Sequence, residues 1–152
     1  GVVGFDLAGD ETDWPNAPYI GCLRDAKLRL GLNTTVHSGE FGGTSPDEVR
    51  SAVLAMHADR VGHGYAAARD PEALAMLHSR GVHLEVCPMS AKRHGAWALQ
   101  AVSVFRSSGL RFGLNTDDPT SFIGNTTAEE DERLVKSLLG FSDEDLMRAY
   151  GS

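Results

Sequence analysis

The sequence has few cysteines and no long apolar run. Its 152 residues include only Cys22 and Cys87, which excludes a disulfide framework as the basis of the fold and favours a reducing compartment. No stretch approaches the roughly 20 consecutive apolar residues of a membrane-spanning helix, and the first residues lack the charged and apolar regions of a signal peptide. These absences predict a cytoplasmic protein with no membrane partner.

Basic residues are also scarce. The chain carries 14 Lys and Arg against 21 Asp and Glu, a net charge of -7, and this balance disfavours a nucleic acid partner, because phosphate groups would be repelled. The length is that of one domain, and the hydrophobic share of 41% is enough to close a core. We therefore expect one soluble globular domain.

The chain alternates between two kinds of segment. Five short β-branched or aliphatic runs, each bounded by turn residues, are typical of strands, and the stretches between and after them have helical patterns. The expected strands are 2–7, 33–37, 60–63, 82–87 and 111–116, and the expected helices are 18–30, 46–57, 71–79, 96–108, 127–139 and 142–150. This order predicts successive βα units with a parallel sheet, an α/β fold.

Two architectures accept five βα units. They can form a complete doubly wound sheet, or they can be five of the eight units of a TIM (β/α)8 barrel, which normally needs about 250 residues. A doubly wound sheet concentrates its ligands near one switch point, whereas a barrel collects catalytic side chains from the carboxyl ends of many strands. The ends of the expected strands can therefore discriminate between the two.

Almost every expected strand ends in chemically active residues. These are Asp6 and Gly9 after the first run, His37 and Glu40 after the second, His63 after the third, Glu85 and Cys87 on the fourth, and Asp117 and Asp118 after the fifth. The distribution favours barrel units, and we expect residues 1–152 to form one partial barrel domain.

His37 is a candidate metal ligand only in combination with other residues. No HExxH or CxxC motif accompanies it, and a lone histidine at a strand end is more often packed or hydrogen-bonded. Asp117 strengthens the case, because imidazole and carboxylate ligands from different strands commonly assemble an open zinc site. Glu40 follows His37 closely enough to reach a substrate at such a metal, which is the position of a general acid or base.

Asp117 and Asp118 are the sharpest local feature. Two adjacent carboxylates at the end of an apolar strand repel each other unless a cation or a donor meets one of them. Successive strand residues point in different directions, so one carboxylate can face a metal and the other a ligand. The competing interpretation is an ordinary turn, in which aspartate is favoured. His63 lies between Gly62 and Gly64, which indicates tight packing, a free approach to the ring, or both.

Five segments in order resemble the signatures of the adenosine deaminase family. They are GVVGFDLAGDE, TVHSGE, RVGHGY, LEVCPMS followed by GAW, and LNTDDP. The resemblance runs from residue 1 to about residue 148, and five collinear motifs are more specific than any one of them. It implies a (β/α)8 barrel with one catalytic Zn²⁺ that hydrolyses adenosine or 2'-deoxyadenosine to the inosine nucleoside and ammonia, a reaction of purine salvage.

The resemblance also implies roles for individual residues. His37 and Asp117 would ligate zinc, and Glu40 would protonate the purine at N1. His63 would orient or deprotonate the attacking water, Asp118 would hydrogen-bond N7 and steer the water, and Gly9 would meet N3 through its backbone N–H. The H-x-E and P-C-x-x-C signature of cytidine-type zinc deaminases is absent.

One family feature is missing from the sequence. The family's first strand supplies an H-x-H pair of zinc ligands, and no two of the six histidines here stand two apart. The first segment matches the family's fourth strand, so we expect this chain to cover strands 4 to 8 and an N-terminal barrel segment to be missing. The alternatives are an adenine or other aminopurine deaminase of the same superfamily, or an inactive fragment.

Overall fold

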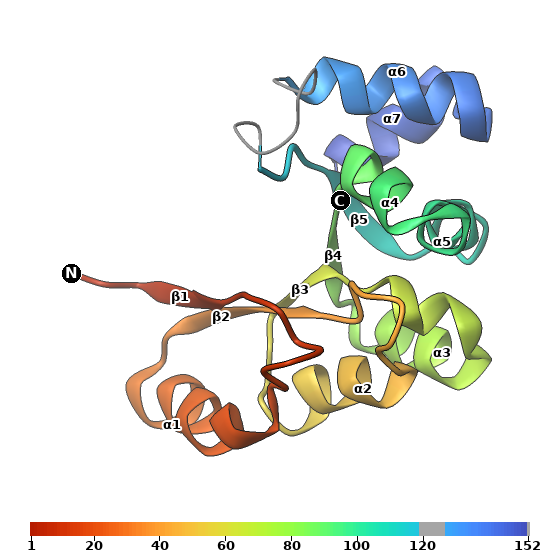
Figure 1. The fold of residues 1–152 in the computed structure, drawn as a ribbon. Helices are drawn as coiled ribbons and strands as arrows, with labels where there is room; N and C mark the ends of the chain where they lie inside the picture. The colour runs from red at the N-terminus through yellow and green to blue at the C-terminus, as the bar shows by residue number, and fades with distance from the viewer. Residues whose placement is uncertain (119–126, 152) are drawn as a thin grey trace.

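The computed structural model describes residues 1–118 and 127–151. A five-stranded sheet forms its centre, every neighbouring pair of strands is parallel, and the strands lie in chain order. Figure 1 shows this curved sheet. The strands are β1 (Gly4–Leu7), β2 (Asn33–Ser38), β3 (Arg60–His63), β4 (His83–Val86) and β5 (Arg111–Leu114).

The strand order decides between the two expected architectures. A doubly wound sheet reverses its order at a switch point, whereas here each new strand is added to the same side of the last one. The helices that follow β1 to β4 also lie along one side of the sheet rather than on both faces (Figure 1). Barrel units have both properties.

The helices largely follow the expected ranges. They are α1 (Ile20–Leu30), α2 (Pro46–Leu54), α3 (Pro71–Arg80), α4 (Pro88–His94), α5 (Ala96–Ser107), α6 (Ala128–Leu139) and α7 (Asp143–Tyr150), with short 3-10 helices η1 (Ala17–Tyr19) and η2 (Tyr65–Arg69). The capping pattern at the start of α7 is confirmed: the Asp145 N–H donates to Ser142 Oγ at 3.1 Å, and the Ser142 N–H donates to Asp145 Oδ2 at 2.9 Å.

The elements differ from the expected ranges in several places, and the strands expected at 2–7 and 111–116 are shortened to Gly4–Leu7 and Arg111–Leu114. α2 ends at Leu54 instead of residue 57, because His57 adopts a left-handed φ of 60° that a right-handed helix cannot contain. The expected strand at 82–87 ends at Val86, and α4 begins two residues later with Pro88 in its first turn. Neither α4 nor η2 was expected, because both are too short to show helical periodicity.

The hydrophobic core lies between the sheet and its helices. Val36, Val61 and Leu84 of successive strands are fully buried there, and Leu77 of α3 and Phe105 of α5 pack into the same cluster. Among the helices of the described residues, none combines the length and apolar composition that crossing a membrane requires. The core thus holds β2 to β4 rigidly, and their carboxyl ends carry the expected site.

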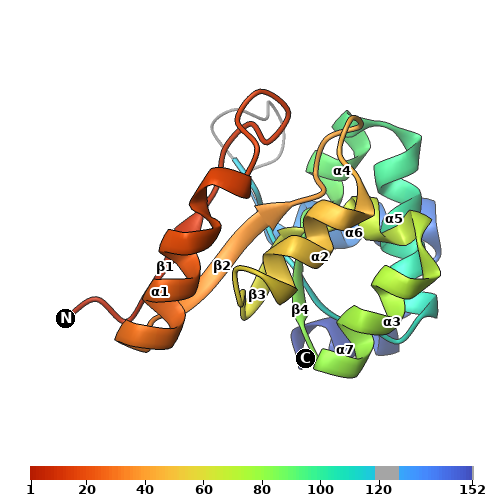
Figure 2. The same cartoon turned by 90° about the horizontal axis from the view of Figure 1, so that it is seen from below.

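The two ends of the described sheet do not meet. β1 pairs with β2 alone and β5 with β4 alone among the described residues, and Figure 2 shows β1 with α1 at one end of the molecule and α5 to α7 at the other. The described sheet is therefore an open sector with two edges.

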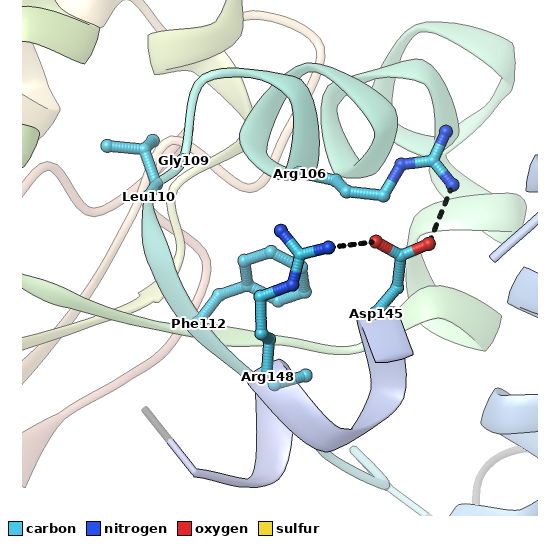
Figure 3. Close-up of a pocket in the computed structure, with 7 residues that line it drawn as sticks. Arg106, Gly109, Leu110, Phe112, Asp145 and Arg148 are labelled. Carbon is cyan, nitrogen blue, oxygen red and sulfur yellow. Dashed lines mark hydrogen bonds and ion pairs between the residues drawn. The ribbon is translucent and has the colours of Figure 1, made fainter. Parts of the chain in front are cut away.

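A cavity of about 210 Å3 lies at the amino end of β5. Figure 3 shows its polar wall, in which Arg106 of α5 and Arg148 of α7 both approach the Asp145 carboxylate, each at 3.5 Å. The Arg106 guanidinium also stacks over the Phe141 ring, 4.6 Å from its centroid. These contacts hold α7 against α5. They lie at the amino ends of the strands, whereas the expected catalytic residues lie at the carboxyl ends.

Candidate active site

The carboxyl ends of β2 and β3 bring two of the expected residues together. Ser38 pairs with His63 in the parallel register, and His37 pairs with Gly62. The rings of His37 and His63 lie 5.0 Å apart between centroids. Gly62 makes this possible, because a Cβ at that position would lie 1.8 Å from His37 Cδ2. The glycine before His63 therefore creates the space that the His37 imidazole fills.

Glu40 lies between two histidines. Its Oε2 is 3.4 Å from His63 Nε2, and its Oε1 is 3.0 Å from His94 Nε2. Burial raises the pKa of Glu40 to about 8, and the nearby carboxylates of Asp117, Glu11, Asp118 and Asp10 raise it further in that direction. The carboxyl is consequently neutral at pH 7 and carries a proton that it can donate.

His63 is buried and neutral. Burial, followed by the neighbouring His37 and His94, lowers its pKa to about 3. Its backbone has a left-handed φ of 64°, a conformation that costs a non-glycine residue free energy and that clusters at functional sites. The ring therefore stays uncharged and can accept a proton only from a strong donor, or orient a water by hydrogen bonding.

Tyr65 fixes which nitrogen of His63 carries hydrogen. The fully buried Tyr65 hydroxyl donates to the Cys87 carbonyl at 3.0 Å and accepts from the Cys87 N–H at 3.2 Å. His63 Nδ1 lies 3.4 Å from the same hydroxyl. Because the only hydroxyl proton is already donated, Nδ1 must be the donor in this contact. The lone pair of His63 is then on Nε2, the nitrogen that faces Glu40.

Asp117 joins a compact group of potential metal donors. One ligand atom each of His63, Cys87 and Asp117 lies within 4.8 Å of the others. Burial, followed by the nearby Asp117 carboxylate, raises the pKa of the Cys87 thiol well above its usual range, so a metal bound there would have to displace the thiol proton. The structure thus places Asp117 beside His63. His37 is not one of these three donors, but its ring contacts that of His63.

The two other expected residues lie in open positions. Asp118 is exposed and follows Asp117 directly. The competing interpretation of this pair as an ordinary turn would involve residue 119, which lies outside the described residues. Gly9 is exposed, and its φ of 146° favours glycine; a Cβ there would meet no atom within 4 Å. The space beside its backbone is compatible with a flat ligand.

Sequence reasoning missed Glu11. This side chain is 6% exposed; its Oε2 accepts the Gly39 N–H at 2.9 Å and its Oε1 accepts the Glu40 N–H at 2.6 Å. It therefore ties the loop after β1 to the loop that carries Glu40. The acidic pair Asp10 and Glu11 directly after a strand was the available signal.

Sequence reasoning also missed His94, and it noted Asp6 only as a strand-end residue without a role. Asp6 Oδ2 lies 3.7 Å from His37 Nδ1, and a carboxylate beside an imidazole is the usual support of a metal-binding histidine. Asp6 was visible as a strand-end carboxylate. His94 gave no signal, because it lies at the end of α4, which lacked a recognisable helical pattern.

His37 and Asp117 have the chemistry that a zinc ion requires. An imidazole and a carboxylate are ordinary zinc ligands, and a catalytic site has three protein ligands and an open position. The described donors therefore fit part of a zinc site.

Comparison with known proteins agrees with the resemblance seen in the sequence motifs. A family model described as adenosine deaminase matches residues 1–151. The chain is 38% identical over 152 residues to the adenosine deaminase of Mus musculus and 34% identical over 151 residues to that of Shewanella denitrificans. These alignments cover 97% and 95% of this chain but only 42% and 43% of the relatives. The chain thus spans about two-fifths of the length of these relatives.

Two solved structures share the fold. A Burkholderia ambifaria amidohydrolase crystallised with bound Zn is 32% identical, with a TM-score of 0.81 over 97% of this chain and 41% of that chain. An adenine deaminase from Arthrobacter aurescens is 25% identical, with a TM-score of 0.79 over 97% of this chain and 44% of that one. The expected sector of a (β/α)8 barrel is confirmed.

Proposed function

This chain belongs to the adenosine deaminase family, and we propose that the protein containing it hydrolyses adenosine and 2'-deoxyadenosine to the inosine nucleosides and ammonia. The observation that carries the proposal is the Glu40 carboxyl, whose Oε2 lies 3.4 Å from His63 Nε2 in surroundings that raise the pKa of Glu40 to about 8. Deamination of a purine needs a proton donor at the ring nitrogen and a base or positioning group for water, and these two residues supply both functions.

Glu40 acts as the general acid. Its neutral carboxyl donates a proton to N1 of the purine, which makes C6 electrophilic. Burial keeps the proton on Glu40 until substrate arrives, since the charged form is disfavoured there. The Glu11 carboxylate holds the backbone N–H groups of Gly39 and Glu40, so the acid does not depend on a freely moving loop.

His63 acts on the water that attacks C6. The Tyr65 contact leaves the lone pair of its Nε2 facing Glu40. Once the Glu40 proton has passed to the purine, this lone pair accepts a hydrogen bond from water and orients the oxygen. The low pKa of His63 favours this positioning role over full proton transfer. Asp118 steers the same water and hydrogen-bonds purine N7, and the Gly9 N–H donates to N3.

Zinc is the proposed cofactor, one ion per site. His37 and Asp117 would hold it, and a zinc ion there would lower the pKa of a bound water from about 16 to near 7. Asp6 would support His37 through its Nδ1 edge. The zinc-bound Burkholderia ambifaria amidohydrolase of the same fold supports this assignment.

The remaining zinc ligands are proposed to come from a preceding barrel segment. The chain covers 42% of its mouse relative, and both outer edges of the described sheet lack a neighbouring strand within the described residues. We propose that residues 1–152 form strands 4 to 8 of one barrel domain, and that the first three strands bring an H-x-H pair. The codons before Gly1 test this point: a reading frame without H-x-H would contradict it.

The experiment uses the complete gene product that contains residues 1–152. Loss of adenosine ultraviolet absorbance with matching ammonia release is expected, with turnover abolished by a chelator and restored by zinc. Adenine is the competing substrate, because an adenine deaminase shares the fold at 25% identity; the 38% identity to a nucleoside enzyme favours adenosine. Turnover of adenine alone would establish the alternative, and a folded, zinc-loaded product that deaminates neither would indicate a non-catalytic protein.

A further inference from the structure

His94 reaches the proposed acid from an element that the sequence did not reveal. It is the last residue of α4, and Gly95 then ends the helix with φ 115° and ψ 177°, a left-handed conformation that favours glycine. The chain turns there into α5. This turn places the His94 ring over the carboxyl end of β2, where Nε2 lies 3.0 Å from Glu40 Oε1.

The His94 ring is held independently of Glu40. The edge of the imidazole packs against Phe41, with 5.0 Å between ring centroids and an interplanar angle of 79°. The His94 carbonyl accepts the Trp97 Nε1–H at 2.9 Å. His94 exposes 22% of its side chain and Glu40 14%, so both partners of the contact are largely shielded from water.

The contact joins two neutral groups. Burial lowers the pKa of His94 although the Asp117 carboxylate raises it, and Glu40 is a neutral acid. Between a neutral imidazole and a neutral carboxyl, either Nε2–H donates to the carbonyl oxygen or the acid O–H donates to Nε2. The second arrangement would direct the acidic proton toward His94 and away from the face shared with His63.

We propose that His94 is a positioning residue for Glu40: its Nε2–H donates to Oε1 and thereby keeps the acidic proton on Oε2, the oxygen beside His63. The inference rests on the proposed function, in which that proton passes to the purine. His94 itself touches neither the substrate nor the metal ligands in this assignment. It acts by selecting one of the two carboxyl oxygens as the donor.

The test compares His94→Gln with His94→Met in the complete gene product. Glutamine and methionine are similar in length, but only glutamine can donate a hydrogen bond to Oε1. Loss of one buried hydrogen bond predicts that His94→Met lowers kcat about tenfold, with KM and zinc content unchanged, while His94→Gln stays within about twofold of wild type. His78→Met, on the exposed face of α3, is the control and leaves kcat unchanged.

Two outcomes would overturn the proposal. One is a His94→Met enzyme with the kcat of wild type; the other is an equal loss in both His94 variants, which would indicate a steric role. A second readout does not depend on turnover: NMR of isotope-labelled histidine should show His94 with hydrogen on Nε2, and Glu40→Ala should shift that signal. A wild-type protein without deaminase activity would contradict the proposed function, whereas hydrogen on Nδ1 of His94 would contradict only this inference.

Discussion

Glu40 and Asp145 lie at opposite ends of the barrel sector and expose the same 14% of their side chains. Their pKa values nevertheless move in opposite directions. Burial and four neighbouring carboxylates raise the pKa of Glu40 to about 8, whereas hydrogen bonds from Ser142, followed by Arg106 and Arg148, lower the pKa of Asp145. At Glu40 the cost of burying a charge is the largest cause and the nearby carboxylates add to it, whereas at Asp145 the hydrogen bonds from Ser142 outweigh that cost.

The two regions therefore serve different purposes. At the amino end of β5, charges are paired and fasten α7 to α5, which is a structural task. At the carboxyl end of the sheet, the acidic groups gather without a described cation among them, and His63 is neutral. Such an arrangement favours a neutral acid and an available binding position for a metal ion, and it accounts for the perturbed groups that mark the proposed site.

The largest expected effect is a loss of kcat when Glu40 is replaced. In the complete gene product, Glu40→Gln removes the donated proton while keeping the size of the side chain, and we expect kcat to fall on the order of a thousandfold. Zinc content should stay the same. Asp145→Asn is the matched control, because it makes the same chemical change at the structural carboxyl; it should slightly lower the melting temperature and leave kcat intact. Equal kcat values for the two variants would refute the distinction.

Tyr65→Phe tests the contact that sets the His63 tautomer, and its expected effect on kcat is smaller. The variant leaves the buried Cys87 N–H and carbonyl without their hydroxyl partner, which predicts a loss of stability of about 1–3 kcal/mol. It also frees His63 to carry hydrogen on either nitrogen, so kcat should fall about tenfold. Denaturant unfolding and steady-state kinetics measure the two effects. A stable variant with full kcat would show that Tyr65 does not set the His63 tautomer.

The sequence predicted those parts of the molecule that depend on local pattern. Short β-branched or aliphatic runs located the five strands of the described residues, and strand ends identified His37, Glu40 and His63 because the carboxyl ends of parallel strands share one edge of the sheet. His94 could not be found in this way, since its contact with Glu40 spans 54 positions and depends on a seven-residue helix. The left-handed backbone of His63 and the Tyr65 link are also long-range effects of packing.

The pH dependence of stability tests the same carboxyl without measuring turnover. The pKa of Glu40 in the folded protein, about 8, is above its ordinary value of 4.5, so the folded state binds the proton more tightly than the unfolded state. Its contribution to stability is fully present below about pH 4.5 and is lost as the pH rises through about 8. Denaturant unfolding of wild type should therefore weaken over this range more than that of Glu40→Gln. Parallel curves for the two proteins would contradict the shifted pKa.

The central claim is that Glu40 is a neutral acid at pH 7, and carbon NMR of its labelled carboxyl in the complete gene product tests this most directly. The signal should be assigned by its loss in Glu40→Gln and followed across the pH range, with and without zinc. We predict a titration midpoint of about 8 in the zinc-free protein. A midpoint near the ordinary value of 4.5 would show that Glu40 is ionised when substrate arrives, and the assignment of the proton donor would be wrong.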